Sequence, residues 1–157
     1  MHPYRVVTYG KANLSLALNS FAHMRFTADE GWNQNAMDAA LLGLTAQAQG
    51  YVLARAAMAP DPAYRFPAFM PHLQDYPPSG DHLGVMNSAV QYMLAVPKDN
   101  AAKGVWLLPS WPCAWDVVFK VNAPNAVVIT GSVQNGKASY KVVGGGPSPD
   151  VTLVNCQ

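Results

Sequence analysis

The sequence predicts an α+β fold in which about four helices precede a small antiparallel β-domain. Two observations predict this class. Up to residue 97 the apolar residues recur mostly at helical spacing, and after Pro97 they alternate with a period of two residues. Short connectors between the helices are typical of the αα-hairpin arrays in helix bundles and α/α barrels. We therefore predict two units, a helical one at residues 1–97 and a β-domain at residues 98–157.

Four segments have the periodicity of helices with one apolar face. Their expected ranges are 14–26, 32–44, 45–58 and 83–95. Asn13 is the expected N-cap of the first helix, and Thr45 that of the third. Alanine is abundant on the second and third helices, which suits close approach of one helix to another.

Five segments alternate in the manner of strands. Their expected ranges are 104–109, 115–122, 126–134, 138–143 and 151–155. Asn135-Gly136 is a strong signal for a type I′ hairpin turn, and Pro124-Asn125 indicates a second turn. A β-unit of this size is marginal as an independent domain, so we expect it to pack on the helices.

The low charge of the chain indicates a partner surface. Charged residues make up 12% of the sequence, against roughly 25% in a typical soluble domain, and half of the residues are hydrophobic. Part of the surface is therefore expected to pack against a further portion of a larger protein or against another copy. The net charge of +1, without basic runs, argues against nucleic acid and membrane surfaces as partners, and no apolar run is long enough to span a membrane.

The two cysteines, Cys113 and Cys156, fit no metal-ligand spacing. We expect two buried free thiols, with a disulfide as the alternative if the protein is exported. The N-terminus shows no apolar segment of the signal-peptide type. The sequence contains no phosphate loop, zinc motif or serine-nucleophile elbow, so no metal and no cofactor is expected.

The proline-rich segment 60–80 and the start of the next helix are the candidate functional region. Loops of this length are often functional. Here aromatic rings alternate with carboxylates and imidazoles, and flat rings can stack on a sugar while carboxylates bind its hydroxyl groups. The residues that we single out for carbohydrate binding or catalysis are Phe69, Asp75, Tyr76, Asp81 and His82. The alternative is a structural loop whose aromatic side chains plug the end of the helices and whose aspartates cap turns.

Three tryptophans, Trp106, Trp111 and Trp115, lie close together at the junction between helices and strands. They could form a sugar platform, but at a junction of this kind we expect them to be packing anchors.

The passage Leu107–Lys120 resembles the sequence that closes glycoside hydrolase family 95 enzymes and their less characterised bacterial relatives. The similarity continues through Asn122-Ala123-Pro124 and residues 131–137. Upstream it includes residues 2–5, Gly10-Lys11, Gly31-Trp32 and residues 65–69. It covers nearly the whole chain, in order.

This resemblance implies that residues 1–97 are the C-terminal helices of an (α/α)6-type barrel. It also implies an inverting α-L-fucosidase or α-L-galactosidase type of activity in a parent protein of a family that is commonly secreted or periplasmic. In the family an aspartate polarises the asparagines that hold the attacking water, and Asp81 stands at the matching distance from Met93-Leu94. The resemblance thus implies a catalytic role for Asp81 and a substrate-binding role for Trp32.

This chain departs from the family pattern after Asp81, where His82-Leu83-Gly84 replaces Gly-Asn-Phe-Gly. The less characterised relatives carry Asp-His at this point. The family's general acid and its water-holding asparagines have no counterpart here. We therefore expect a C-terminal glycoside hydrolase segment that is inactive alone. The alternative is a non-catalytic module that binds carbohydrate or self-associates.

Overall fold

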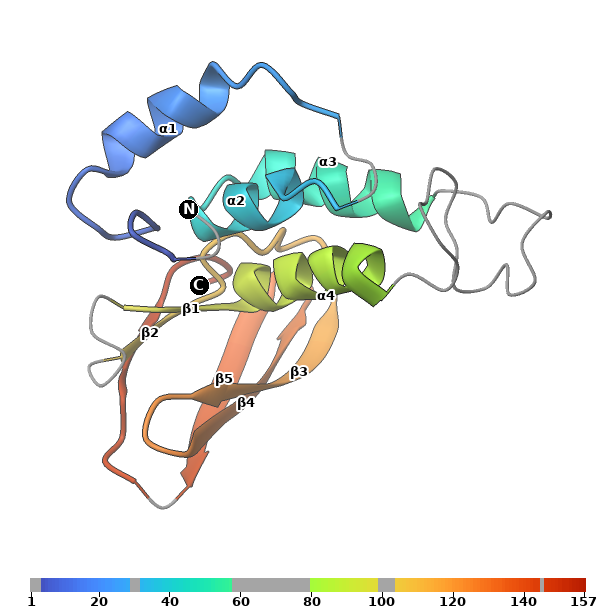
Figure 1. Ribbon diagram of the computed structural model, residues 1–157. Helices are drawn as coiled ribbons and strands as arrows, with labels where there is room; N and C mark the ends of the chain where they lie inside the picture. Colours follow the sequence, from blue (N-terminus) through green and yellow to red (C-terminus); the bar gives the residue numbers. More distant parts are fainter. Residues whose placement is uncertain (1–3, 29–31, 58–79, 99–103, 145) are drawn as a thin grey trace.

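The computed structural model describes residues 4–28, 32–57, 80–98, 104–144 and 146–157. For Asp81 and His82 it describes the backbone but not the side chains. Within this part of the chain, four helices lie on one side of the molecule and two three-stranded sheets on the other (Figure 1). The α+β class expected from the sequence is confirmed.

The helices occur in the expected order. The first three are shorter than their apolar patterns predict, and the fourth begins earlier than expected. They are α1 (Leu14–Ala22), α2 (Asn35–Leu41), α3 (Thr45–Ala56) and α4 (Gly80–Leu94). Asn13 does occupy the N-cap position of α1, although its side chain makes no capping hydrogen bond. The expected capping role of Thr45 is wrong, because Leu44 is the N-cap and Thr45 is the first residue of α3.

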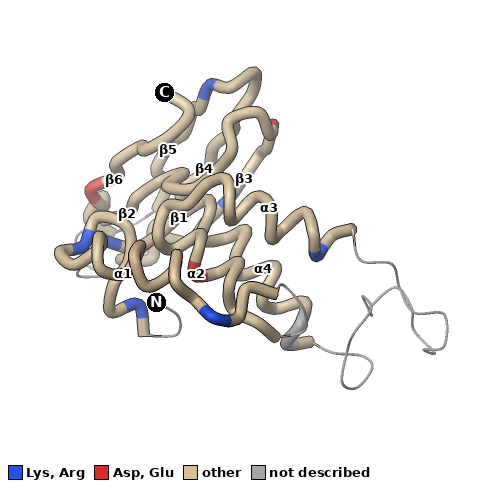
Figure 2. The backbone as a smooth tube through the Cα atoms, turned by 90° about the horizontal axis from the view of Figure 1, so that it is seen from above, with Lys and Arg blue, Asp and Glu red and all other residues tan. Residues whose placement is uncertain are grey.

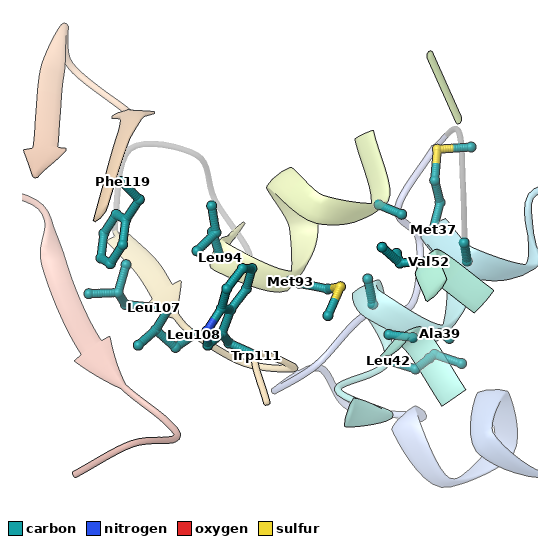
Figure 3. Packing of buried hydrophobic residues seen from close by; sticks show 14 of the residues in the cluster. Met37, Ala39, Leu42, Val52, Met93, Leu94, Leu107, Leu108, Trp111 and Phe119 are labelled. Carbon is teal, nitrogen blue, oxygen red and sulfur yellow. The ribbon is translucent and has the colours of Figure 1, made fainter. Parts of the chain in front are cut away.

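Helices α2 and α4 pack closely because small side chains face each other. Ala36 and Ala40 of α2 are fully buried, as are Ala89 and Met93 of α4. Val85, Ala89 and Met93 are four residues apart and so form one stripe along α4. Figure 3 shows the Met93 side chain between the helical part of the core and the part near Trp111. A single buried cluster therefore joins the helices to the sheets.

The turn between α2 and α3 depends on glycine. Gly43 has a φ of 77°, a left-handed conformation that ends many helices and that side chains with a Cβ adopt at a cost. A Cβ atom at this position would lie 2.5 Å from the Tyr9 ring. The backbone N–H of Tyr9 in turn donates to the carbonyl of Leu41 at 2.7 Å. Gly43 thus lets the N-terminal segment cover the end of α2.

The strands form two sheets, so the expected single antiparallel unit is wrong in part. One sheet has the order β1 (Ala95–Pro97), β2 (Gly104–Leu107) and β6 (Asp150–Leu153), with β2 parallel to β6. The other is the antiparallel meander β3 (Val117–Ala123), β4 (Val127–Gln134) and β5 (Lys137–Gly144).

The pairing of β1 with β2 crosses the division that we expected at residue 97. The fourth helix ends at Leu94, and the chain continues directly into β1. The first sheet therefore takes strands from both sides of that expected boundary.

Both expected turns in the meander are present. Asn135 and Gly136 have φ values of 50° and 79°, as a type I′ turn requires, and they join β4 to β5 with Gln134 opposite Lys137. Asn125 has a φ of 65° in the three-residue turn between β3 and β4.

The two cysteines form a disulfide, so the expectation of free thiols is wrong. The Cα atoms of Cys113 and Cys156 lie 5.3 Å apart, and the bond closes a loop with a sequence separation of 43. This loop contains the whole meander. The carbonyl of Cys156 also accepts a hydrogen bond from the N–H of Ala138 at 2.7 Å. The C-terminus is therefore attached both to β5 and to the segment that precedes β3.

Candidate functional site

The elements that carry the sequence-predicted site meet at one end of the helical layer. We call this the helix end: the first turns of α2 and α4 together with the last turn of α3 (Figure 1). Arg55, in the last turn of α3, donates from Nη2 to the carbonyl of Asn33, 3.0 Å away, just before α2. The guanidinium group is buried, so this charge-assisted bond fixes the approach of α3 to the start of α2.

Trp32 lies at the helix end and presents its indole ring to solvent. Its side chain is 66% exposed. The backbone around it is held by amide groups, because Nδ2 of Asn33 and Nδ2 of Asn35 both donate to the carbonyl of Ala28, at 3.1 and 3.0 Å. Asn35 is itself buried. A ring that is exposed on a fixed backbone is suited to stacking on a flat ligand surface.

Asp81 is the second residue of α4, and His82 follows it in the same turn. A carboxylate in the first turn of a helix is stabilised by the exposed N–H groups and by the positive end of the helix dipole. The topology thus brings the backbone of Asp81 to the end of the layer at which Trp32 lies. The remaining expected substrate-binding residues, Phe69, Asp75 and Tyr76, lie outside the described residues.

The three junction tryptophans make packing contacts, which supports the packing interpretation. Trp111 is buried, its Nε1 donates to the carbonyl of Trp115 at 2.9 Å, and the two rings meet edge to face at 5.7 Å. Trp106 lies edge to face with Tyr9 at 5.4 Å. Lys98 Nζ lies 4.4 Å from the centre of the Trp106 ring.

Lys98 joins the strands around Trp106. Its ammonium group donates to Oδ2 of Asp150 and to Oγ1 of Thr152, both at 2.6 Å. These contacts connect the residue after β1 to β6, across β2. The ion pair of Lys98 with Asp150 thus adds a side-chain link to the backbone pairing of the first sheet.

Sequence reasoning did not identify a second polar feature, the outer face of the β3–β5 meander. We use the term outer face for the side chains of Val118, Lys120, Thr130, Ser132, Gln134, Ser139 and Lys141, which alternate with the core-facing residues of the three strands. They line a shallow concavity of about 640 Å³. The alternation of polar and apolar residues in each strand, combined with the turn at Asn135-Gly136, could have predicted that these side chains share one face.

The described residues form neither a cluster of metal ligands nor a membrane-spanning helix. Among them, no group of three or more His, Cys, Asp or Glu side chains is arranged to hold a metal ion. None of the helices in this part of the chain is both long and apolar enough to cross a membrane. Figure 2 shows that lysines and arginines are scattered over the fold and not gathered along one helix.

Comparison of the chain with models of known protein families, with curated proteins and with solved structures found no match.

Proposed function

We propose that this chain is the C-terminal segment of a glycoside hydrolase-like protein that acts on α-linked sugars of the fucose or galactose type. Its helices would belong to an (α/α)6-type barrel, and the chain would contribute one part of the active site. The observation that supports the proposal is that the first turn of α4, which contains the backbone of Asp81, lies at the same end of the helical layer as the exposed Trp32 ring (Figure 1). A carboxylate and an aromatic ring in one site would suit a sugar ring and its hydroxyl groups.

In the proposed mechanism Asp81 acts through water. An inverting glycosidase places its two carboxyl groups roughly 6.5–9.5 Å apart, so that a water molecule fits between the base and the anomeric carbon. Asp81 would polarise the groups that orient this water, and Trp32 would stack on the sugar face. The general acid, which protonates the leaving oxygen, would come from another part of the parent protein.

The disulfide supports a secreted or periplasmic location of the proposed parent protein. Disulfide bonds form and persist in oxidising compartments, such as the periplasm and the cell exterior. Cys113–Cys156 is therefore in keeping with a secreted or periplasmic parent protein.

The purified 157-residue chain is expected not to hydrolyse aryl α-L-fucoside or aryl α-L-galactoside, because the general acid of the family that it resembles has no counterpart in it. If the DNA upstream encodes the rest of a barrel in frame, the longer protein should hydrolyse one of these substrates. Asp81→Asn should then lower its kcat about 10²–10⁴-fold, the usual contribution of a group that assists proton transfer. The absorbance of the released aryl alcohol measures the activity of the 157-residue chain and the kcat of the longer protein.

Asp116→Asn is the matched control, because Asp116 precedes β3, away from the helix end, and its Oδ1 accepts the N–H of Asn135 at 2.9 Å. This variant should retain full turnover. Turnover by the 157-residue chain that disappears with Asp81→Asn would show that the chain is self-sufficient. An unchanged kcat for Asp81→Asn in the longer protein would remove Asp81 from the mechanism.

A second candidate function, a self-associating module, is favoured by the exposed apolar residues near the N-terminus. Helix α1 contains no charged residue and buries only Ala17 and Phe21. Large apolar side chains that are 65–85% exposed lie within and around it, namely Tyr4, Val6, Leu16 and Phe26. Such a surface is typical of an interface, with the remainder of a barrel or with a second copy.

If the surface around α1 binds a second copy, light scattering should give a mass above 16.8 kDa that rises with concentration. Leu16→Lys together with Phe26→Lys should return the mass to that of a monomer, because burying a lysine at an interface is costly. Val143→Lys adds a charge at another exposed apolar position, on β5, and should leave the association unchanged. A monomer at all concentrations would exclude this function.

A further inference from the structure

We propose that the outer face of the β3–β5 meander binds the anionic group of an acidic glycan, either a sulfate ester or a carboxylate. The site consists of Lys120 and Lys141 with the hydroxyl group of Thr130 between them. The choice of a glycan rests on the proposed function, whereas the anion site rests on the charge and hydrogen bonding of the sheet.

The register of the sheet sets one row of three side chains across the three strands. Lys120 of β3 is opposite Thr130 of β4, and Thr130 is opposite Lys141 of β5. Directly opposed residues in antiparallel strands have their side chains on the same face, with Cβ atoms about 4.5–5.5 Å apart. Two ammonium groups are therefore within reach of one anion above Thr130.

The hydroxyl group of Thr130 is the second observation that points to a ligand. Its Oγ1 atom is buried, yet within the described residues it has no hydrogen-bond partner. A buried hydroxyl without a partner carries a desolvation cost that an acceptor oxygen of a ligand would remove. The lysine stems on either side explain how a hydroxyl on the outer face of a sheet can be shielded from water.

The charge of the meander is complementary to an anion. Strands β3, β4 and β5 contain three lysines, Lys120, Lys137 and Lys141, and no acidic residue. Neither Lys120 nor Lys141 has an ion pair in the part of the chain that the structure describes. Their charges are available to a ligand, unlike the charge of Lys98, which is paired with Asp150.

The rest of the outer face fits a sugar better than a nucleic acid. In the neighbouring row the hydroxyl groups of Ser132 and Ser139 lie 3.3 Å apart, and Val118 is 81% exposed beside them. Hydroxyl groups can exchange hydrogen bonds with sugar hydroxyls, and an exposed valine can contact sugar C–H groups. Binding of single strands of nucleic acid relies on rows of aromatic rings that stack on bases. Here Phe119 is buried and Tyr140 is the other aromatic residue that lines the concavity, so the described lining offers no such row.

The test is titration calorimetry of the 157-residue chain with a sulfated oligosaccharide, a uronate oligosaccharide and the neutral parent of each. At least one acidic glycan should bind ten-fold or more tightly than its neutral parent, and binding should weaken as salt is added. Whichever acidic oligosaccharide binds more tightly identifies the anionic group as sulfate or carboxylate. Failure of both acidic glycans to bind at millimolar concentration would overturn the proposal.

Substitutions of Lys120 and Lys141 should distinguish a specific anion site from non-specific electrostatic attraction. Lys120→Gln and Lys141→Gln should each weaken binding about five-fold, within the range of exposed ion pairs, and together about twenty-five-fold if they act independently. Lys11→Gln removes the same charge near the N-terminus and should leave binding unchanged. Equal weakening by Lys11→Gln, or equally tight binding of oligothymidylate or polyglutamate, would overturn the glycan site.

Thr130→Val distinguishes a ligand contact from a structural role. It keeps the shape of the side chain and removes only the hydroxyl group. Binding should weaken about three-fold, while Tm should rise by about 2–4 °C because the unpaired buried hydroxyl is gone. Unchanged binding would remove Thr130 from the site. Hydrolysis plays no part in these measurements, so they stand whether or not the proposed enzymatic function holds.

Discussion

Replacing Cys113 and Cys156 together with alanine is expected to lower the free energy of unfolding by about 4 kcal/mol. The disulfide closes a loop with a sequence separation of 43, and a loop of that length loses about this much chain entropy in the unfolded state when it is crosslinked. Native domains are stable by only about 5–15 kcal/mol, so the variant would lose a large share of its stability. Urea unfolding, followed by tryptophan fluorescence, measures the difference.

The matched control is the wild-type chain with and without a reductant. The reduced wild type should unfold at nearly the same urea concentration as the double alanine variant, since both lack the crosslink. Alkylation before reduction, followed by mass spectrometry, should detect no free thiol. A free thiol on each cysteine of the native chain would show that the bond does not form in solution.

Met93→Ala is expected to lower the free energy of unfolding by about 2–5 kcal/mol. The Met93 side chain is fully buried, and it occupies the centre of the core between the helices and the Trp111 region (Figure 3). Truncation removes apolar contacts and leaves a cavity that closely packed alanines on α2 cannot fill by rotating. Urea unfolding again gives the difference.

Two variants on α4 control for the Met93 result. Met93→Leu keeps most of the volume and should cost less than about 1.5 kcal/mol. Gln91→Ala, at an exposed position two residues away, should change the stability by no more than about 0.5 kcal/mol. A small effect of Met93→Ala would mean that the helical and β-rich parts of the core do not depend on each other.

The two largest effects act at the same junction. The disulfide ties the C-terminus to the segment after Trp111, and Met93 packs toward that segment from α4. Loss of either is expected to loosen the helices from the sheets, which would displace the helix end from the rest of the protein. If the proposed function is correct, Asp81 and Trp32 depend on this junction for their position.

For the helix end, the local pattern and the resemblance both predicted a role for Asp81, whereas the resemblance alone predicted one for Trp32. Trp32 and Asp81 are far apart in the chain. Their placement at one end of the layer follows from the packing of α2 on α3 and α4, and from the Arg55 bond to Asn33 (Figure 1). No local preference encodes that placement. In contrast, Thr130 lies on strands joined by tight turns, so the alternation of each strand and the positions of the turns could have placed it in one row with Lys120 and Lys141.

By itself the sequence determined the α+β class, the order of helices and meander strands, and the turn at Asn135-Gly136. Each depends on periodicity or on φ preferences within a few residues. Only the tertiary structure decided that β1 and β6 join β2 in a separate sheet, and that Cys113 meets Cys156. The pairing of β2 with β6 and the disulfide both join residues across the whole meander. Such pairing depends on where the packed core places the chain, which a local pattern does not specify.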